Sequence, residues 1–366
     1  MVLQQTMSLF GCSLAEGSPT SGHECFYTCA RYARRKLAHQ TCVRQLQRGR
    51  PTNGLYSKWM NYLAIRSSES RFVPVRGLNY HVHTWGDASL VSPERPPLLM
   101  LHGWMDVGAS FQFVVDALAQ ADGFERYVLA PDWRGFGRTE TPDADTYWFP
   151  DYLADLDALL DALLPLETFG AIDLLGHSMG GNVAMTYAGV RPRRIRRLVN
   201  LEGFGMPATR PQQAPKRLAQ WLDELKQPQT LRDYASVAEV AKRLMKNNPL
   251  LAADKAAWLA PHWSARDAQG RWKILGHPAH KRVNPVLYDV PQVLETWKLI
   301  SAPLLWVEGD LTDVAKWWGT RYTKEEFHQR LSTVPGVQRA TLSPSGHMLH
   351  HDQPQALALH LKGFLS

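Results

Sequence analysis

Apolar and polar positions follow patterns typical of β-strands from about residue 70 onward. Residues 71–76 and 78–84 alternate between apolar and polar side chains, like two paired strands joined at Gly77. Short runs with strand-like composition follow at 97–101, 127–130, 171–175, 198–201, 303–307 and 339–342. These runs predict the strands of a sheet that is largely buried.

Segments with helical spacing of apolar residues separate the predicted strands. They lie at 110–120, 152–164, 182–188 and 355–365, and leucines give the segment 152–164 one broad apolar face. Strands that alternate with helices pair in parallel and are joined by right-handed crossovers. We therefore predict an α/β fold with a mostly parallel central sheet and helices on both of its faces.

The alternation stops at Gly205 and resumes near residue 301. Residues 206–300 have an irregular helical pattern that includes nine prolines and five tryptophans. A helical block between two stretches of one parallel sheet is a cap rather than an independent domain. We therefore predict a core formed by 71–205 and 301–366, a helical cap over 206–300, and an extension over 1–70.

The net charge of +7 arises almost entirely from the first 59 residues. That segment has eight lysines and arginines against two glutamates and contributes +6, which leaves +1 for residues 60–366. A body so close to neutral gives no reason to expect a nucleic-acid partner. No apolar run approaches the length of a membrane span, and the start lacks the basic region of a signal peptide. We expect a cytoplasmic protein whose basic extension is disordered.

All four cysteines lie in the same extension, at positions 12, 25, 29 and 42. The rest of the chain therefore offers no thiol nucleophile and needs no disulfide. The spacing of Cys25, Cys29 and Cys42 fits no common zinc finger. We expect neither a metal nor a cofactor, and nothing in the sequence specifies an oligomeric state.

The segment GHSMG, residues 176–180, lies between a predicted strand and a predicted helix. It fits the G-x-S-x-G nucleophile elbow, in which a strained strand-to-helix turn exposes the serine and glycines let the backbone approach closely. The candidate nucleophile is Ser178. A serine nucleophile needs a base, an acid that orients the base, and donors for an oxyanion.

The candidate base is His347, which follows a predicted strand and precedes the last predicted helix. A loop at that place can lean over the carboxyl end of the sheet. His350 and His351 are close in sequence, but we interpret them as polar residues that precede Asp352 as the N-cap of the last helix.

Three further segments carry a resemblance to a known family. LHGWMDVGASF, residues 101–111, resembles the LHGW-x-DN-x-x-SF signature of the serine hydrolase-like branch of the α/β-hydrolases, with Val107 in place of asparagine. DWRGFGRT, residues 132–139, resembles the D-x-R-G-x-G-x-S loop with Thr139 in the serine position, and GHSMGG matches the elbow of the family. The resemblance covers residues 71–366, and it implies oxyanion donors at the backbone N–H groups of Trp104 and Met179.

The acid is where the sequence departs from the family pattern. Relatives place it three residues past the glycine of the strand spelled here PLLWVEGD, but that position is Thr312, which cannot serve. Asp310 and Asp313 flank it, and Glu202 ends the preceding strand, where haloalkane dehalogenases have a carboxylate. We place Asp310 first, Glu202 second and Asp313 third.

A serine nucleophile excludes the chemistry of epoxide hydrolases and haloalkane dehalogenases, which need a carboxylate nucleophile. The sequence predicts a serine hydrolase that cleaves a small-to-medium carboxylic ester or thioester through an acyl-enzyme. One alternative is hydrolysis of a C–C bond by the same three groups, which requires a polar or cationic pocket for a carboxylate. The other is a non-catalytic ligand-binding protein on a hydrolase fold.

Overall fold

The structure is a computed structural model, and it describes residues 62–121 and 124–366. The predictions of a disordered, cysteine-containing extension therefore lie outside the described residues up to position 61. Among the described residues, no helix is both long and apolar enough to cross a bilayer.

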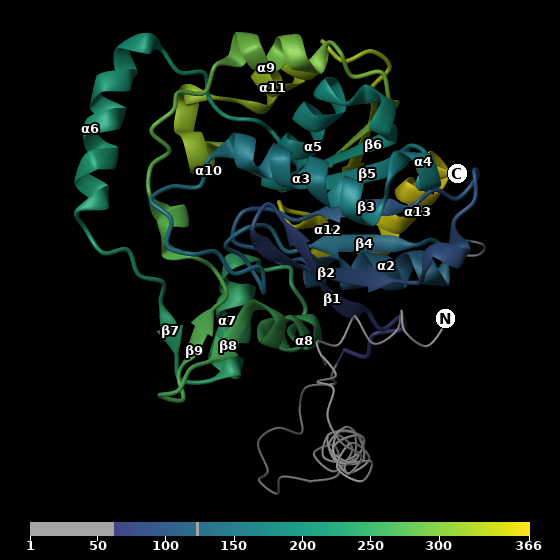
Figure 1. Cartoon of the computed structure of the whole chain (residues 1–366), viewed down its shortest axis with the longest axis horizontal. Helices are drawn as coiled ribbons and strands as arrows, with labels where there is room; N and C mark the ends of the chain where they lie inside the picture. Colours follow the sequence, from purple (N-terminus) through teal and green to yellow (C-terminus); the bar gives the residue numbers. More distant parts are fainter. Residues whose placement is uncertain (1–61, 122–123) are drawn as a thin grey trace, which may run out of the picture. The chain divides into compact units, whose positions relative to one another are not determined.

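An eight-stranded sheet forms the centre of the described residues (Figure 1). Its strands lie in the order β1-β2-β4-β3-β5-β6-β10-β11. Strands β1 and β2, and β2 and β4, pair antiparallel, and the remaining pairs are parallel. The prediction of a mostly parallel sheet is confirmed. The bounds are β1 (Glu69–Val75), β2 (Leu78–Trp85), β3 (Leu98–Leu101), β4 (Val128–Pro131), β5 (Ile172–His177), β6 (Ile195–Leu201), β10 (Leu304–Gly309) and β11 (Gln338–Leu342).

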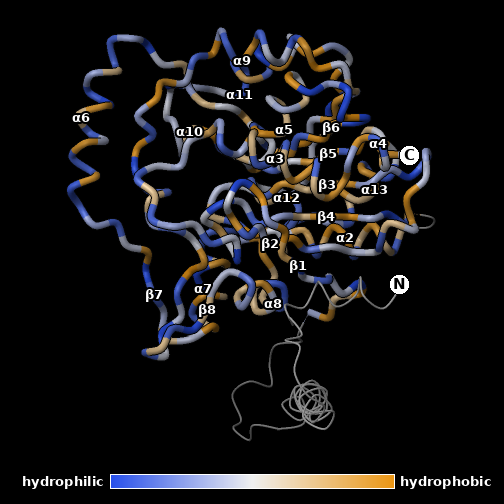
Figure 2. Tube along the Cα trace, viewed as in Figure 1, coloured by the Kyte–Doolittle hydropathy of each residue, from blue (hydrophilic) through white to orange (hydrophobic). Residues whose placement is uncertain are grey.

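Consecutive side chains of a buried strand point to opposite faces of the sheet, and each face has its own layer of helices. In β3, Leu99 and Leu101 join one apolar cluster, whereas Leu98 and Met100 join another. The first cluster is covered by α3 (Phe149–Leu163), α5 (Met179–Val190), α9 (Val290–Trp297) and α11 (Lys324–Leu331). The second is covered by α2 (Gln112–Gln120), α12 (Leu349–Asp352) and α13 (Pro354–Leu365). Figure 2 shows the hydrophobic colouring of the central strands between these layers.

The block predicted as a helical cap contains strands as well as helices. Its elements are α6 (Ala214–Leu225), β7 (Asp233–Tyr234), α7 (Val237–Asn247), α8 (Ala253–Trp263), β8 (Ser264–Arg266), β9 (Trp272–Ile274) and α9. The three short strands form a separate sheet in the order β7-β9-β8. The expectation of a wholly helical block was wrong in this respect, because two- and three-residue strands leave no alternation that can be recognised. The last helix of the block, α9, packs against α5 of the core.

The cap is joined to the loop that follows β4. The N–H of Gly137 donates to the carbonyl of Leu275 at 2.9 Å, and the N–H of His277 donates to the carbonyl of Gly135 at 2.7 Å. Gly135 and Gly137 both have positive φ, at 70° and 55°, which glycine adopts without strain. A Cβ on Gly137 would overlap the Asp132 carboxylate, and one on Gly135 would overlap the side chain of Tyr147, so both positions of this contact require glycine.

The folded body begins before residue 71, where the sequence boundary was drawn. Strand β1 begins at Glu69. Ahead of it, the backbone N–H groups of Ile65 and Arg66 donate to the Asp116 carboxylate at 3.1 and 2.8 Å. Packed structure is therefore already present within the range 62–70.

The remaining helices connect these layers. They are α4 (Leu166–Phe169), α10 (Ala315–Trp318) and the 3₁₀ turns η1 (Ala88–Leu90), η2 (Gly108–Phe111), η3 (Pro192–Arg194), η4 (Pro211–Gln213), η5 (Pro278–Lys281) and η6 (Gly319–Arg321). Helix α10 lies in the segment after β10, where two of the candidate acids were placed.

Candidate active site

Ser178 occupies the turn between β5 and α5 in a strained backbone conformation. Its φ of 52° and ψ of −115° are unusual for a residue with a side chain. The glycines beside it are required by space. A Cβ on Gly180 would lie 2.6 Å from the carbonyl oxygen of His102, and one on Gly176 would collide with the carbonyl of Gly180. The turn is therefore the elbow that the sequence predicted, with the serine held at the carboxyl end of the sheet.

His347 lies on the loop between β11 and α12 and reaches the serine. Its Nε2 lies 2.9 Å from Ser178 Oγ. The backbone of this loop is held at several points. The carbonyl of His347 accepts from Nε2 of His177 at 2.8 Å, and the N–H of Gly346 donates to Asp352 at 2.9 Å. The predicted nucleophile and base are thus brought within hydrogen-bond distance of each other.

The carboxylate that contacts His347 is Glu202, at the end of β6. Its Oε2 lies 2.8 Å from Nδ1 of His347, and its Oε1 accepts the N–H of Gly309 at 2.7 Å. Glu202 has a φ of 56° and its side chain is fully buried. A buried carboxylate on Nδ1 fixes that nitrogen as the N–H donor, which leaves Nε2 free to accept the serine proton.

Asp310, the first-ranked acid, does not make this contact. Its oxygens accept the hydroxyl of Ser343 at 2.6 Å and the N–H of Ser345 at 2.8 Å. Asp313 accepts the N–H of Ala315 at 3.0 Å, where it caps the turn before α10. Both aspartates are exposed. The structure therefore corrects the order of the candidates, because Asp310 binds two serines of the loop that carries His347, Asp313 binds a residue of its own loop, and only Glu202 contacts the imidazole.

The two predicted oxyanion donors flank the serine. Met179 is the first residue of α5, so its N–H has no partner within the helix. Trp104 follows Gly103, whose backbone lies so close to the serine that a Cβ there would be 3.2 Å from Ser178 Cβ. The side chain of Trp104 is half exposed. Both residues therefore lie next to Ser178 in the structure.

Two further histidines lie beside the site, and burial keeps both neutral. His102 accepts the N–H of Trp133 on Nε2 at 2.8 Å, and its Nδ1 donates to the carbonyl of Gly103 at 2.7 Å. Burial lowers the pKa of His102, and burial together with neighbouring histidines lowers the pKa of His177 well below its ordinary value. We therefore interpret both as structural histidines.

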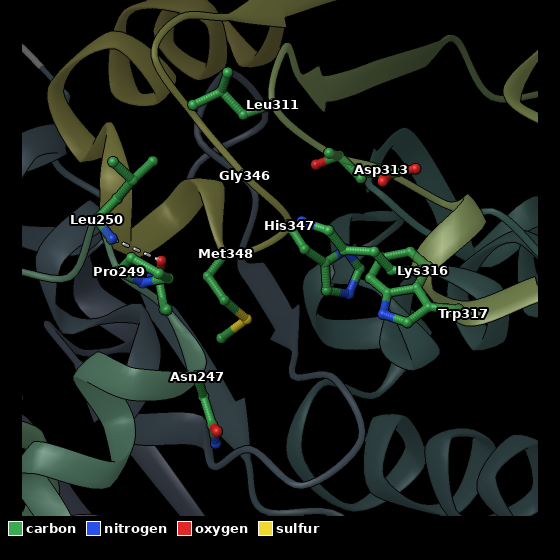
Figure 3. A pocket seen from close by; sticks show the side chains of 12 residues that line it. Asn247, Pro249, Leu250, Leu311, Asp313, Lys316, Trp317, Gly346, His347 and Met348 are labelled. Atoms are coloured by element: carbon green, nitrogen blue, oxygen red, sulfur yellow. Dashed lines mark hydrogen bonds between the residues drawn. The ribbon is translucent and has the colours of Figure 1, made fainter.

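A pocket opens beside His347, with a volume of about 370 Å³ (Figure 3). The indole of Trp317 contacts the imidazole edge to face, with 4.6 Å between ring centroids. Met348 and Leu311 add apolar surface, and Lys316 adds a positive charge. Asp313 also lines the pocket, which thus combines two groups of opposite charge with apolar and aromatic walls.

Known proteins share the fold of this chain. A family model described as the alpha/beta hydrolase fold matches residues 96–354. The chain belongs to the α/β hydrolase family. A zebrafish serine hydrolase-like protein is 31% identical over 147 residues, which cover 40% of this chain and 41% of that protein. The resemblance to the serine hydrolase-like branch is therefore confirmed.

Other relatives extend over more of the chain. A cis-3-alkyl-4-alkyloxetan-2-one decarboxylase of Shewanella oneidensis is 26% identical over 281 residues, covering 74% of this chain and 82% of that enzyme. The thioesterase domain from the curacin biosynthetic pathway superposes with a TM-score of 0.68 at 28% identity, covering 81% of this chain and 99% of the domain. The names of these relatives differ in reaction type, so the family alone does not select a substrate.

Sequence reasoning missed two groups that hold the loop between β11 and α12. This loop carries the candidate base His347 and is called the base loop below. His177 was not among the predicted site residues, and Asp352 was expected to cap the last helix. Instead, α13 begins after Gln353, and Asp352 accepts hydrogen bonds from Gly346 and from Asn248 of the cap. The pairing of His177 with His347 spans 170 residues, and the signal that could have suggested it is the position of His177 next to the nucleophile.

Proposed function

We propose that the protein is a serine hydrolase that cleaves a carboxylic ester or thioester through an acyl-enzyme. The observation that supports this most strongly is the relay from Glu202 through His347 to Ser178, with contacts of 2.8 and 2.9 Å. Family membership supports the same reaction class. A non-catalytic ligand-binding protein would have no need for a strained serine paired with an oriented imidazole.

The proposed reaction has two halves. Ser178 Oγ attacks the substrate carbonyl carbon while its proton passes to Nε2 of His347, and the N–H groups of Met179 and Trp104 stabilise the oxyanion. The C–O or C–S bond then breaks, and the leaving alcohol or thiol takes the proton from His347. Water attacks the acyl-serine in the same way, assisted by His347, and releases the carboxylic acid.

The pocket supports a small-to-medium acyl or leaving group. Its volume of about 370 Å³ is near the lower end of small-molecule sites, and its apolar walls include Trp317, Met348 and Leu311. Apolar walls favour alkyl or aromatic substituents, because burying them removes hydrophobic surface from water.

The direct test is hydrolysis of p-nitrophenyl acetate and butyrate and of the matching acyl thioesters. Wild-type protein should turn over at least one of these series, and Ser178→Ala should lose the activity. His347→Ala should lose nearly as much, and the double variant should be little worse than either, because the residues act as a unit. Substantial turnover by Ser178→Ala would contradict the proposal.

Lys316 supports a second candidate reaction, hydrolysis of a C–C bond in a dienone acid. Lys316 lines the pocket beside His347 and could pair with the substrate carboxylate. If this reaction is the native one, a 6-oxodienoic acid should be cleaved far better than the esters. Lys316→Met should then raise KM for the acid while leaving turnover of a neutral ester unchanged. Equal effects on both substrates would rule out a carboxylate-binding role for Lys316.

A further inference from the structure

A second group of polar side chains lies buried beneath the loops that carry the oxyanion donor and the base. Asp106 follows Trp104 by two residues, and His350 and His351 follow His347 within α12. The residues are 3%, 0% and 3% exposed, respectively. Each offers one ligand atom, and these three atoms lie within 4.8 Å of one another.

The hydrogen bonds of Asp106 are confined to one of its oxygens. Oδ1 accepts the N–H of Val107 at 2.9 Å, the indole N–H of Trp263 at 3.1 Å, and the hydroxyl of Ser110. Oδ2 has no hydrogen-bond partner among the described residues. Its nearest basic neighbour is Nε2 of His350, at 3.6 Å, which is too long for a hydrogen bond. A buried carboxylate oxygen with no donor is costly unless a cation offsets it.

The histidines of this group are equally short of partners. Both ring nitrogens of His350 and Nε2 of His351 are buried without a hydrogen bond among the described residues. Most buried polar atoms in folded proteins are paired, so several unpaired atoms in one place call for an occupant. All of these atoms are of the types that bind divalent transition metals.

Another buried group, also of two histidines and one aspartate, can be compared with the Asp106 group. His81, His83 and Asp132 also present ligand atoms within 4.8 Å of one another. Their polar atoms, however, are used: His81 contacts Asp132 at 2.7 Å and Ser70 at 2.6 Å, and His83 contacts Ser68 at 3.3 Å. This group is satisfied by the protein itself and needs no ion.

We propose that Asp106, His350 and His351 bind one divalent transition-metal ion, with Zn²⁺ as the first candidate. Tetrahedral zinc with bonds of about 2.0–2.2 Å places its ligand atoms ~3.4 Å apart, close to the Asp106–His350 separation of 3.6 Å. The ion would supply the missing partner of Oδ2 and of one ring nitrogen on each histidine, and it departs from the expectation that the chain needs no metal.

The ion would also have a structural effect on the active site. Asp106 belongs to the loop that carries Trp104, and His350 lies three residues after His347. Coordination would therefore connect the loop after β3, which carries Trp104, to the base loop, which carries His347. The ion holds these loops in place and takes no part in the chemistry, so its presence can be tested whether or not the proposed hydrolase activity is correct.

The experiment is a crystal of the full chain grown or soaked with Zn²⁺, with anomalous diffraction recorded on both sides of the zinc edge. We expect a peak at bonding distance from Asp106, His350 and His351. Elemental analysis of protein dialysed against Zn²⁺ and then desalted should give one equivalent. Co²⁺ in place of Zn²⁺ should give the visible absorption of a four-coordinate site. A crystal with Zn²⁺ only at surface positions, or with no ion, would overturn the proposal.

Variants provide a second readout. Asp106→Asn keeps an amide oxygen for Val107, Ser110 and Trp263 but removes the carboxylate charge, so it should lose the bound equivalent while staying folded. His351→Gln should do the same and serves if the first variant fails to fold. The matched control is His83→Gln in the satisfied group, which should retain full Zn²⁺ binding. Unchanged stoichiometry in both cluster variants would contradict the assignment.

Discussion

The loops that follow β6 and β10 each begin with a carboxylate, and the two carboxylates behave differently. The strands are parallel neighbours, with Leu201 paired to Val307, so Glu202 and Asp310 start from the same edge of the sheet. Glu202 is buried and bridges His347 and the N–H of Gly309. Asp310 is exposed and holds Ser343 and Ser345 of the base loop.

Backbone conformation, rather than position in sequence, selects the residue that reaches the imidazole. Glu202 has a φ of 56°, which turns its side chain into the sheet edge, and it has one methylene more than aspartate. Asp310 instead accepts the N–H of Ser345, two residues before His347. One carboxylate orients the base directly, and the other supports the backbone that carries it.

Glu202→Gln should have the largest effect on this pair. The amide can no longer stabilise the imidazolium that forms during proton transfer, and it can donate to Nδ1 and so favour the wrong tautomer. Loss of the acid in such a relay costs about 10⁴ in kcat. The measurement is kcat for the best ester substrate, with circular dichroism to show that the variant is folded. Activity within tenfold of wild type would remove Glu202 from the relay.

Glu202→Asp should have an intermediate effect on kcat. It tests whether the side chain must be long enough to bring the carboxylate to His347. The charge is retained, but the shorter side chain draws the carboxylate back from the 2.8 Å contact with His347. A misplacement of about 1 Å can cost on the order of 10²-fold in rate. We expect kcat to fall by about that factor, with KM changed little. A variant as inactive as Glu202→Gln would show that charge without the correct position contributes nothing.

Asp310→Asn should reduce kcat by only a few-fold. The amide oxygen can still accept the N–H of Ser345, so the base loop keeps most of its support. The matched measurement is the ratio of kcat values for Asp310→Asn and Glu202→Gln on the same substrate. A loss near 10⁴ for Asp310→Asn would reverse the comparison and restore the first-ranked acid.

The smallest effect concerns stability at low pH. Burial lowers the pKa of His83 to about 4 and that of His280 to about 3. Unfolded histidines take up protons near pH 6.5, so stability is complete above about pH 6.5 and falls as the pH decreases toward those values. The hydrogen bonds from Ser343 and Ser345 lower the pKa of Asp310, so its contribution is lost only below about pH 3.9.

Melting temperatures of wild type and Asp310→Asn should therefore fall in parallel from pH 6.5 to 4. Their difference should narrow only at lower pH, as the Asp310 carboxylate becomes protonated. Scanning calorimetry across this range is the measurement. A difference that narrows already between pH 6 and 5 would mean that Asp310 titrates in another environment.

The sheet, the nucleophile and the base could be predicted because each depends on local pattern. Apolar strand runs, helical spacing and the glycines around Ser178 are visible over a few residues. The acid could not be settled in this way, because the positive φ of Glu202 is not specified by its residue type. Counting three residues on from Gly309 led to the loop after β10, whereas the carboxylate that contacts His347 follows β6. Gly309 contacts that carboxylate only through its backbone N–H, which donates to Glu202.

The contacts that hold the base loop also escaped prediction, for a different reason. His177 and His347 are 170 residues apart, and their contact exists only once β5 and the base loop meet at the sheet edge. The group formed by Asp106, His350 and His351 joins segments that are 244 residues apart in the chain, counted from Asp106 to His350. Such proximity is a property of the tertiary fold.

The measurement that tests the central claim most directly is labelling with a fluorophosphonate, read by intact-protein mass spectrometry and peptide mapping. This probe reacts with an activated serine and requires no knowledge of the substrate. Wild-type protein should gain one phosphonyl group at Ser178, and Ser178→Ala should gain none. Glu202→Gln should react much more slowly than wild type, whereas Asp310→Asn should react at a similar rate. Wild-type protein that stays unlabelled, or an adduct that maps to another serine, would contradict the account.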